Sequence, residues 1–166
     1  GYCSTCVAHL KSYPQLFLSD PRWKARAEAF AACVKDAAQC LPPESIQACE
    51  SALSSYHDAC RLINGQGVSS EPRAAMKKMC GEAYRELPEA SVCCGGAGAF
   101  AFVHPELSDT LLRAKTGHLA STHARVVAAT STSCLLQLAH GLKKYYPEAR
   151  VAHLTELVWE ALRRGT

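Results

Sequence analysis

The segment Val92-Cys93-Cys94-Gly95-Gly96-Ala97-Gly98 places two adjacent cysteines directly before a glycine-rich turn. Neighbouring side chains seldom point at the same target, so Cys93 and Cys94 can serve one site only where the backbone kinks. Glycine permits such a kink because it lacks a Cβ atom. Two thiolates and several backbone N–H groups around one small volume are typical of an iron–sulfur site. The segment therefore predicts a fold that brings further cysteines to this pair.

The cysteine content favours ligands over a disulfide scaffold. The chain has 10 cysteines in 166 residues, which is below the density that marks small secreted proteins. A chain of this length buries about two-thirds of its unfolded surface and does not need disulfides to fold. In a reducing compartment the cysteines are then interpreted first as metal or cluster ligands, with structural disulfides as the alternative.

Charge and hydropathy exclude two classes of partner. The net charge is only +3 and is spread along the chain, which gives no basic surface for nucleic acid. The sequence has no apolar run long enough for a transmembrane helix and no signal-peptide pattern at its start. We therefore expect a cytoplasmic protein without direct membrane insertion.

From Ile46 onward, short apolar runs alternate with helical patterns. We predict strands at 51–57, 83–87, 125–130 and 149–153, and helices at 72–80, 105–122, 134–145 and 154–164. This alternation predicts an α/β fold with a mainly parallel sheet of about four strands flanked by helices. The two clearest helices would bury one apolar stripe each: Leu107, Leu111, Leu112 and Leu119 in the first, and Leu154, Leu157, Val158, Ala161 and Leu162 in the last.

The first 43 residues form an appendage with its own cysteine pair. Cys3-Ser4-Thr5-Cys6 is a Cys-x-x-Cys that looks like the end of a longer ligand set. A helix is predicted from Asp20-Pro21 to the stop at Pro42-Pro43, because an N-cap and a proline at the first helical position precede apolar residues at helical spacing. Those residues are Trp23, Ala27, Phe30, Val34, Ala38 and Leu41.

The predicted layout gathers distant cysteines at one rim. Cys60, the Cys93-Cys94 pair and Cys134 each fall in a loop after a predicted strand, and the carboxyl edge of a parallel sheet collects such loops. Cys134 also begins a helix, where the dipole favours a thiolate. The remaining cysteines lack ligand-like spacing and are interpreted as small packing residues: Cys33, Cys40, Cys49 and Cys80. A disulfide between Cys40 and Cys49 is left open.

Several residues near these cysteines are candidates for a supporting role. His57 and Asp58 precede Cys60 and could orient the loop or hydrogen-bond a cluster sulfur, although a loop histidine that caps a carbonyl group is an equal alternative. The N–H groups of Gly95, Gly96 and their neighbours are candidate donors to the sulfurs. The glycine run lacks the residues of a phosphate-binding loop, and the chain has no nucleophile elbow and no His-Glu-x-x-His helix.

These residues together resemble a known family. The stretches 57–62 (His-Asp-Ala-Cys-Arg-Leu), 93–98, 105–107 (Pro-Glu-Leu) and 131–137 (Ser-Thr-Ser-Cys-Leu-Leu-Gln) look like the second of the two cysteine-rich CCG repeats found in heterodisulfide reductase. The resemblance is closest to the C-terminal part of the iron–sulfur subunit of glycolate oxidase and D-lactate dehydrogenase complexes. It implies that residues 1–43 hold the end of a first CCG repeat plus a connecting helix, and that 44–166 form the second repeat.

The resemblance also implies a ligand set and a cofactor. Cys60, Cys93, Cys94 and Cys134 would ligate the cluster, and Cys3 with Cys6 would match the closing Cys-x-x-Cys of the first repeat. The family pattern has a further cysteine where this chain has Ser131, so the resemblance implies four thiolates and a [4Fe-4S] cluster rather than the larger non-cubane assembly. The chain would be a fragment or an excised C-terminal domain.

The implied function is electron transfer without catalysis by this domain alone. Its implied partners are a flavin-containing oxidoreductase subunit that oxidises a 2-hydroxy acid and other iron–sulfur domains, and the complex would reach the inner membrane only peripherally. Two other functions stay open. One is a structural zinc site with four cysteine ligands, and the other is a disulfide reductase subunit, which the loss of a cysteine at Ser131 disfavours.

Overall fold

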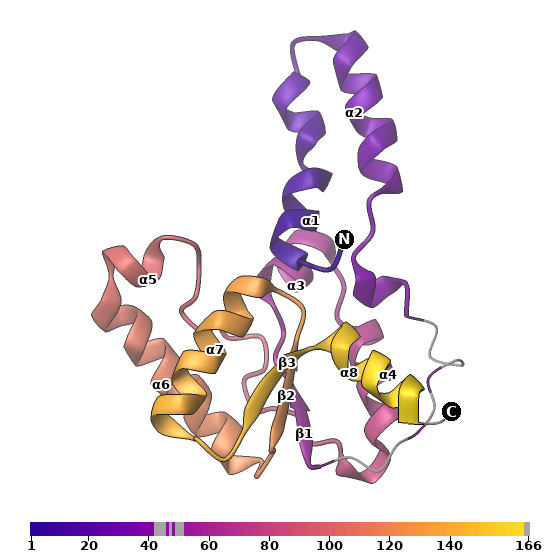
Figure 1. The fold of residues 1–166 in the computed structure, drawn as a ribbon. Coiled ribbons are helices and arrows are strands. Elements are labelled where there is room, and N and C mark those ends of the chain that lie inside the picture. Colours follow the sequence, from indigo (N-terminus) through magenta and orange to yellow (C-terminus); the bar gives the residue numbers. More distant parts are fainter. Residues whose placement is uncertain (42–45, 47, 49–51, 165–166) are drawn as a thin grey trace.

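A parallel three-stranded sheet forms the centre of the computed structural model, which describes residues 1–41, 46, 48 and 52–164 (Figure 1). Strand β1 (Ser54–Tyr56) pairs with β2 (Val126–Ala129), and β2 pairs with β3 (Arg150–His153). The predicted α/β class with a parallel sheet is confirmed. The strand count is slightly lower than predicted, because the segment 83–87 contributes only one parallel bridge, between Ser54 and Tyr84.

The predicted strand at 83–87 is reduced by its flanks. A 3-10 turn, η4 (Gly81–Ala83), ends directly before Tyr84. Pro88 follows soon after and has no N–H group to donate to a ladder. The backbone therefore runs beside β1 only long enough for Arg85 to donate to the carbonyl of Ser54 at 2.8 Å.

Helices cover both faces of the sheet (Figure 1). On one face lie α6 (Pro105–Ser121) and α7 (Thr132–Tyr145), and on the other lie α4 (Ser70–Cys80) and α8 (Leu154–Arg164). Pro105 opens α6 at its first position, where the missing N–H costs nothing. Gly141 lets α7 approach α6 closely, since a Cβ there would lie 2.4 Å from Leu112 Cδ1. The core between the layers contains Tyr56, Leu62, Met76, Leu119, Val127, Leu138, Leu142, Leu154, Leu157 and Val158.

The connections reverse direction at β1. After β1 the chain passes through α4, and Tyr84 then pairs with one edge of β1. The chain next passes through α6 and enters β2, which pairs with the other edge of β1. In open α/β sheets such a reversal leaves a crevice outside the carboxyl ends of the strands, where ligands bind. The segments that follow β1 and β2 therefore meet at a natural binding position.

The N-terminal residues form a helical arm that projects beyond the carboxyl edge of the sheet (Figure 1). It consists of α1 (Ser4–Lys11), η1 (Tyr13–Phe17) and α2 (Pro21–Cys33), and η2 (Ala37–Gln39) follows it. The prediction that the helix continues to Pro42 is wrong. It ends at Cys33, because Val34 adopts an extended backbone (φ −78°, ψ 121°).

The apolar stripe predicted for α2 does not face the core. Within α2 only Ala27 is buried, and Trp23 and Phe30 are 42% and 46% exposed. Their rings instead pack within the arm, Trp23 on Phe17 and Phe30 on Tyr13. The arm is held together by these local aromatic contacts.

The other predicted elements are found with shifted ends. Strand 51–57 is observed as Ser54–Tyr56, with residue 51 outside the described residues, and α7 starts before the predicted 134.

In α6, Leu112 and Leu119 are buried as predicted, whereas Leu107 is 59% exposed on the first turn. In α8, Leu154, Leu157, Val158 and Ala161 are buried, while Leu162 is 39% exposed. Within the part of the chain that the structure describes, three short α-helices were not predicted: α1, α3 (Cys60–Gln66) and α5 (Phe100–Val103). Among the described helices, none is both long and apolar enough to cross a membrane.

Candidate metal centre

Four cysteines from three separate segments line one cavity of about 200 Å³. Cys94 and Cys134 are buried, and Cys60 and Cys93 are half-buried. The structure therefore brings these four cysteines together, as predicted. Their role as metal ligands stays a prediction. The rest of the wall consists of small or polar residues: Thr5, Ala59, Arg61, Gly96, Ala97, Gly98, Ser131 and Ser133.

Two of the cysteines lie at helix N-termini. Cys60 is the first residue of α3, which follows β1, and Cys134 lies in the first turn of α7, which follows β2. The prediction of a loop at Cys60 is wrong, because the chain turns helical there and ends the helix at Gly67 in a left-handed conformation (φ 68°). Both thiols thus lie where unpaired N–H groups and the helix dipole favour negative charge.

The loop that carries Cys93 and Cys94 depends on its two glycines. Gly95 has a φ of 86°, and a Cβ there would lie 2.7 Å from the carbonyl oxygen of Ser108. A Cβ at Gly96 would lie 2.7 Å from Gln137 Cβ and 2.9 Å from the carbonyl oxygen of Ser133. The loop therefore fits between α6 and α7 only without side chains here. The N–H of Gly95 also donates to Cys93 Sγ at 3.3 Å, as the sequence predicted for a glycine donor.

Hydrogen bonds couple the thiols of Cys93, Cys94 and Cys134. The bond to Cys134, with burial, raises the pKa of Cys94 to about 12. The bond to Cys94, with burial, raises the pKa of Cys93 far above its usual value, and the bond from Cys94 lowers the pKa of Cys134. The raised pKa values keep Cys93 and Cys94 protonated at neutral pH, because adjacent thiolates would repel one another. A bound cation removes this conflict, since thiols that coordinate a metal are fully deprotonated.

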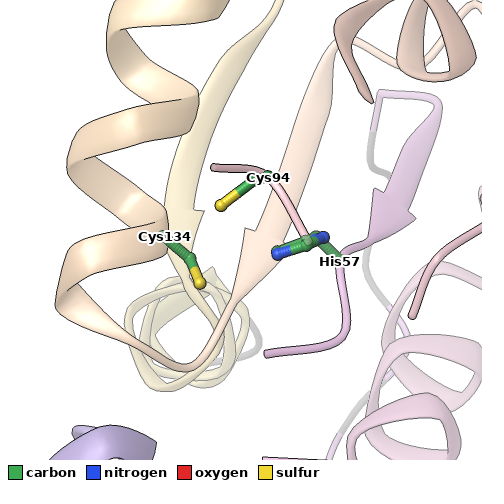
Figure 2. Close-up of side chains that lie close together, drawn as sticks. All are labelled: His57, Cys94 and Cys134. Atoms are coloured by element: carbon green, nitrogen blue, oxygen red, sulfur yellow. The ribbon is translucent and has the colours of Figure 1, made fainter. Parts of the chain in front are cut away.

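The side chain of His57 points toward the sulfurs of Cys94 and Cys134 (Figure 2). Ligand atoms of His57, Cys94 and Cys134 all lie within 4.8 Å of one another, and all three residues are buried. Burial, together with the nearby charge of Lys115, lowers the pKa of His57 to about 3, so its imidazole is neutral at neutral pH. Its Nδ1 atom is buried and has no hydrogen-bond partner among the described residues. A buried polar atom without a partner is costly.

Asp58, predicted beside the cluster together with His57, has a different environment. Its carboxylate is 2% exposed and accepts bonds from Arg73 Nη1 at 2.9 Å and Nη2 at 2.5 Å. Arg73 also pairs with Glu86 at 2.8 Å. Asp58 therefore anchors the loop between β1 and α3 to helix α4, and the cavity wall does not include it.

Cys3 and Cys6 are not among the residues that line the cavity. Cys3 is the N-cap of α1, which abuts the start of α7: Ser4 N–H donates to the carbonyl of Thr130 at 3.0 Å. Partial burial favours the neutral thiol, but bonds from the N–H groups of Cys6 and Thr132 outweigh it and lower the pKa of Cys3 to about 7. Cys6 is exposed, and the hydrogen bond and charge of Cys3 raise its pKa.

The remaining cysteines divide into two groups. Cys80 is buried on α4, as predicted for a packing residue, whereas Cys33 and Cys40 are exposed, so that prediction is wrong for them. Cys33 is the last residue of α2, which does not face the core, and Cys40 follows η2. Cys49 and a Cys40–Cys49 bond lie outside the described residues. All nine cysteines within the described residues are free thiols.

Sequence reasoning missed the residues of α6 that support the loop. Ser108 donates to the carbonyl of Gly95 at 3.0 Å, and Lys115 donates to the carbonyls of Glu89 and Ala90. Both lie on the buried stripe of α6 with Leu112 and Leu119. Hydropathy gave no signal for them, because it favours the leucines of this helix as the buried positions.

The sequence matches one known domain family and is similar to several known proteins. Residues 54–139 match the CCG cysteine-rich domain. The chain is 32% identical over 168 residues to the probable glycolate oxidase iron-sulfur subunit of Bacillus subtilis, which covers 97% of this chain and 38% of that protein. It is 26% identical over 162 residues to lactate utilization protein A of Oceanobacillus iheyensis, which covers 95% of this chain and 66% of that protein.

A second lactate utilization protein A, from Geobacillus kaustophilus, is 28% identical over 158 residues, which covers 93% of this chain and 66% of that protein. The chain thus spans between 38% and 66% of the length of these relatives. The match to the CCG domain covers more than half of the chain and includes Cys60, Cys93, Cys94 and Cys134. By this match and the cavity that the four cysteines line, the chain belongs to the CCG cysteine-rich domain family.

Proposed function

We propose that the cavity holds an iron–sulfur cluster through Cys60, Cys93, Cys94 and Cys134, and that the chain is an electron-transfer domain of an oxidoreductase complex. The observation that carries this proposal is that four thiols from three segments line one cavity of about 200 Å³. One matched relative is named an iron-sulfur subunit. When bound, such a cluster accepts and releases one electron at a time.

The donor set suits this cofactor. Iron–sulfur clusters are held by cysteine thiolates, and four of them match a [4Fe-4S] cube. Ser131 lines the same wall, where the family pattern has a further cysteine, but its hydroxyl is hydrogen-bonded to Thr5 at 3.0 Å and to Ser133 at 3.2 Å. This leaves four thiolates as the natural ligands, and we therefore propose the cubane form.

The protein residues control water access and charge at this site. Cys94 and Cys134 are buried, while Cys60 and Cys93 are half-buried toward the cavity opening. The Gly95 N–H bonded to Cys93 Sγ would stabilise negative charge on that sulfur. His57, neutral and with an unpartnered nitrogen, would support Cys94 and Cys134 from the sheet side.

The wider assembly is inferred from the relatives. Because the Bacillus subtilis relative is named a subunit and is much longer than this chain, we propose that the domain works beside other iron–sulfur domains and a flavin-containing subunit that oxidises a 2-hydroxy acid. Residues 1–43 would complete a first CCG repeat and 44–166 would form the second. The complex would be cytoplasmic, with at most peripheral contact to the inner membrane.

A structural zinc site is the second candidate, and one observation favours it. The ligand atoms of His57, Cys94 and Cys134 lie within 4.8 Å of one another, a compact set that suits a single tetrahedral ion. Zinc would need one further ligand, and Cys60 and Cys93 line the same cavity. Such a site would stabilise the fold and carry no electrons.

Anaerobic purification of the full chain, followed by iron and sulfide analysis and electron paramagnetic resonance, separates the two. We expect a brown protein with about four irons and four sulfides per chain, as a cubane cluster requires. Cys93→Ser and Cys134→Ser should each lose most of the iron, whereas Cys80→Ser, which alters a buried cysteine of α4 outside the cavity wall, should retain it. A colourless protein with stoichiometric zinc, or equal iron loss in all three variants, contradicts the proposal.

A further inference from the structure

Lys115 is a buried lysine on α6, beside the loop that leads to Cys93. The residue is 2% exposed and lies on the helix stripe that otherwise packs against the core. Its Nζ atom donates to the carbonyl oxygen of Glu89 and to that of Ala90, the latter at 3.4 Å. A lysine so deeply buried is rare unless its charge has a partner.

Within the described residues, Lys115 forms no ion pair with a carboxylate. The carboxylates of Asp58 and Glu89 also raise the pKa of Lys115, but Asp58 is engaged by Arg73 and Glu89 is exposed to solvent. Two neutral carbonyl groups satisfy hydrogen bonds but do not balance a charge. Burial of an unbalanced ammonium group is unfavourable, so a counter-charge is expected nearby.

The cavity thiols are the groups that can supply this charge. Burial lowers the pKa of Lys115, whereas negative charge on Cys94, Asp58, Cys93 and Glu89 raises it, and the two cysteines carry that charge when they are thiolates. The field of Lys115 also reaches His57, where it adds to the effect of burial on the pKa of that residue. The lysine thus interacts electrostatically with Cys93 and Cys94 of the cavity wall and with the neighbouring His57.

We propose that Lys115 is the counter-cation of the anionic thiolate-ligated centre and raises its reduction potential. The inference rests on the proposed function. A cluster held by four thiolates carries net negative charge, and its potential depends on the charge around it. A fixed positive charge stabilises the reduced, more negative form. At an effective dielectric constant of about 20, a unit charge within about 10 Å changes such an equilibrium roughly tenfold or more.

A purely structural role for Lys115 makes a different prediction. Glu89 has a φ of 53°, a left-handed conformation that is unfavourable for a residue with a side chain, and Lys115 bonds to its carbonyl. If the lysine only holds this turn, an uncharged donor should replace it. Lys115→Gln keeps a hydrogen-bond donor without the charge, Lys115→Met removes both, and Lys115→Arg keeps both.

The test is a redox titration of the reconstituted full chain, followed by electron paramagnetic resonance. In Lys115→Gln and Lys115→Met, the ratio of reduced to oxidised cluster at a fixed potential should fall about tenfold or more, which corresponds to about 59 mV for one electron. Lys115→Arg should stay close to the wild type. Loss of iron from both neutral variants, with retention in Lys115→Arg, also supports the proposal.

Three results overturn it: an unchanged potential in both neutral variants, a shift in Lys115→Met alone, or equal iron loss in all three variants. If the wild type takes up zinc and no iron, the proposed function fails while the role of Lys115 remains testable. The Kd for zinc, measured by chelator competition, should then rise about tenfold in the two neutral variants only. If the wild type binds neither metal, both proposals fail.

Discussion

The Ser108 hydroxyl on α6 donates a hydrogen bond to the Gly95 carbonyl oxygen at 3.0 Å. Gln137 on α7 donates to the same hydroxyl at 2.9 Å. The loop that carries Cys93 and Cys94 is thus attached to both helices on one face of the sheet. This attachment requires a glycine at position 95, because a Cβ there would lie 2.7 Å from the Ser108 carbonyl oxygen.

The first prediction concerns that glycine. Gly95→Ala should lower the free energy of unfolding by about 2–3 kcal/mol, since alanine is strained at a φ of 86° and contacts the backbone of Ser108. Urea unfolding followed by circular dichroism measures the change. Gly117→Ala is the matched control on α6, where an added Cβ meets nothing within 4 Å. It should be neutral or stabilising by up to about 1 kcal/mol. Similar losses in both variants would be incompatible with this account of the loop.

The second prediction concerns the anchor of the loop before Cys60. Arg73→Met leaves the carboxylate of Asp58, which is 2% exposed, without its partner. Removing one member of a buried ion pair costs about 3–5 kcal/mol, and we expect about 3 kcal/mol because Arg73 is 24% exposed. Lys24→Met breaks the exposed pair with Glu28 on α2 and should cost less than about 0.5 kcal/mol. Denaturant unfolding of both variants checks this, and an Arg73→Met effect as small as that of the control would show that the pair is not needed.

The sequence predicted the convergence of the cysteines because two of the three segments follow strands of a parallel sheet. Cys134 after β2 and Cys60 after β1 are placed by topology alone, once the strands are recognised. The short helix that begins at Cys60 was missed because seven residues carry too little periodicity to distinguish a helix from a loop. The early end of α2 at Cys33 was missed because its apolar residues match a core-facing stripe but pack on η1 instead.

The contribution of α6 to the site was not predicted for a related reason. Only the leucine positions of this helix were interpreted, and Leu107 proved exposed while Ser108 and Lys115 proved buried. A stripe drawn through Ser108, Leu112, Lys115 and Leu119 has the same helical spacing as one that starts at Leu107. Hydropathy alone favours the leucine, and only the position of the 89–95 loop shows why polar side chains are buried there.

The third prediction concerns the acidity of Cys3. The N–H groups of Cys6 and Thr132, with the hydroxyl of Thr132, outweigh the opposing effect of partial burial and lower the pKa of Cys3 to about 7. Because only the thiolate reacts with iodoacetamide, alkylation of Cys3 should fall to half its maximal rate near pH 7, against about 8.5 for an ordinary thiol. Peptide mapping by mass spectrometry follows the rate at each pH. Thr132→Val removes the hydroxyl donor and should move the midpoint to higher pH. A midpoint in the wild type at the value of an ordinary thiol would exclude the predicted interaction of Cys3 with the start of α7.

The last prediction concerns His57, whose imidazole lies with the sulfurs of Cys94 and Cys134 in one compact group (Figure 2). One of its ring nitrogens lies within 4.8 Å of both sulfurs, close enough to contact a centre bound there. In the reduced, cluster-loaded protein, pulsed electron paramagnetic resonance should therefore detect a nitrogen coupling that disappears in His57→Phe. Phenylalanine retains the ring shape, so the fold and most of the iron should be kept. His140→Phe, on an exposed position of α7, should leave the coupling unchanged. A coupling that survives in His57→Phe would come from backbone nitrogen, and the imidazole would then be only a packing group between β1 and the cavity.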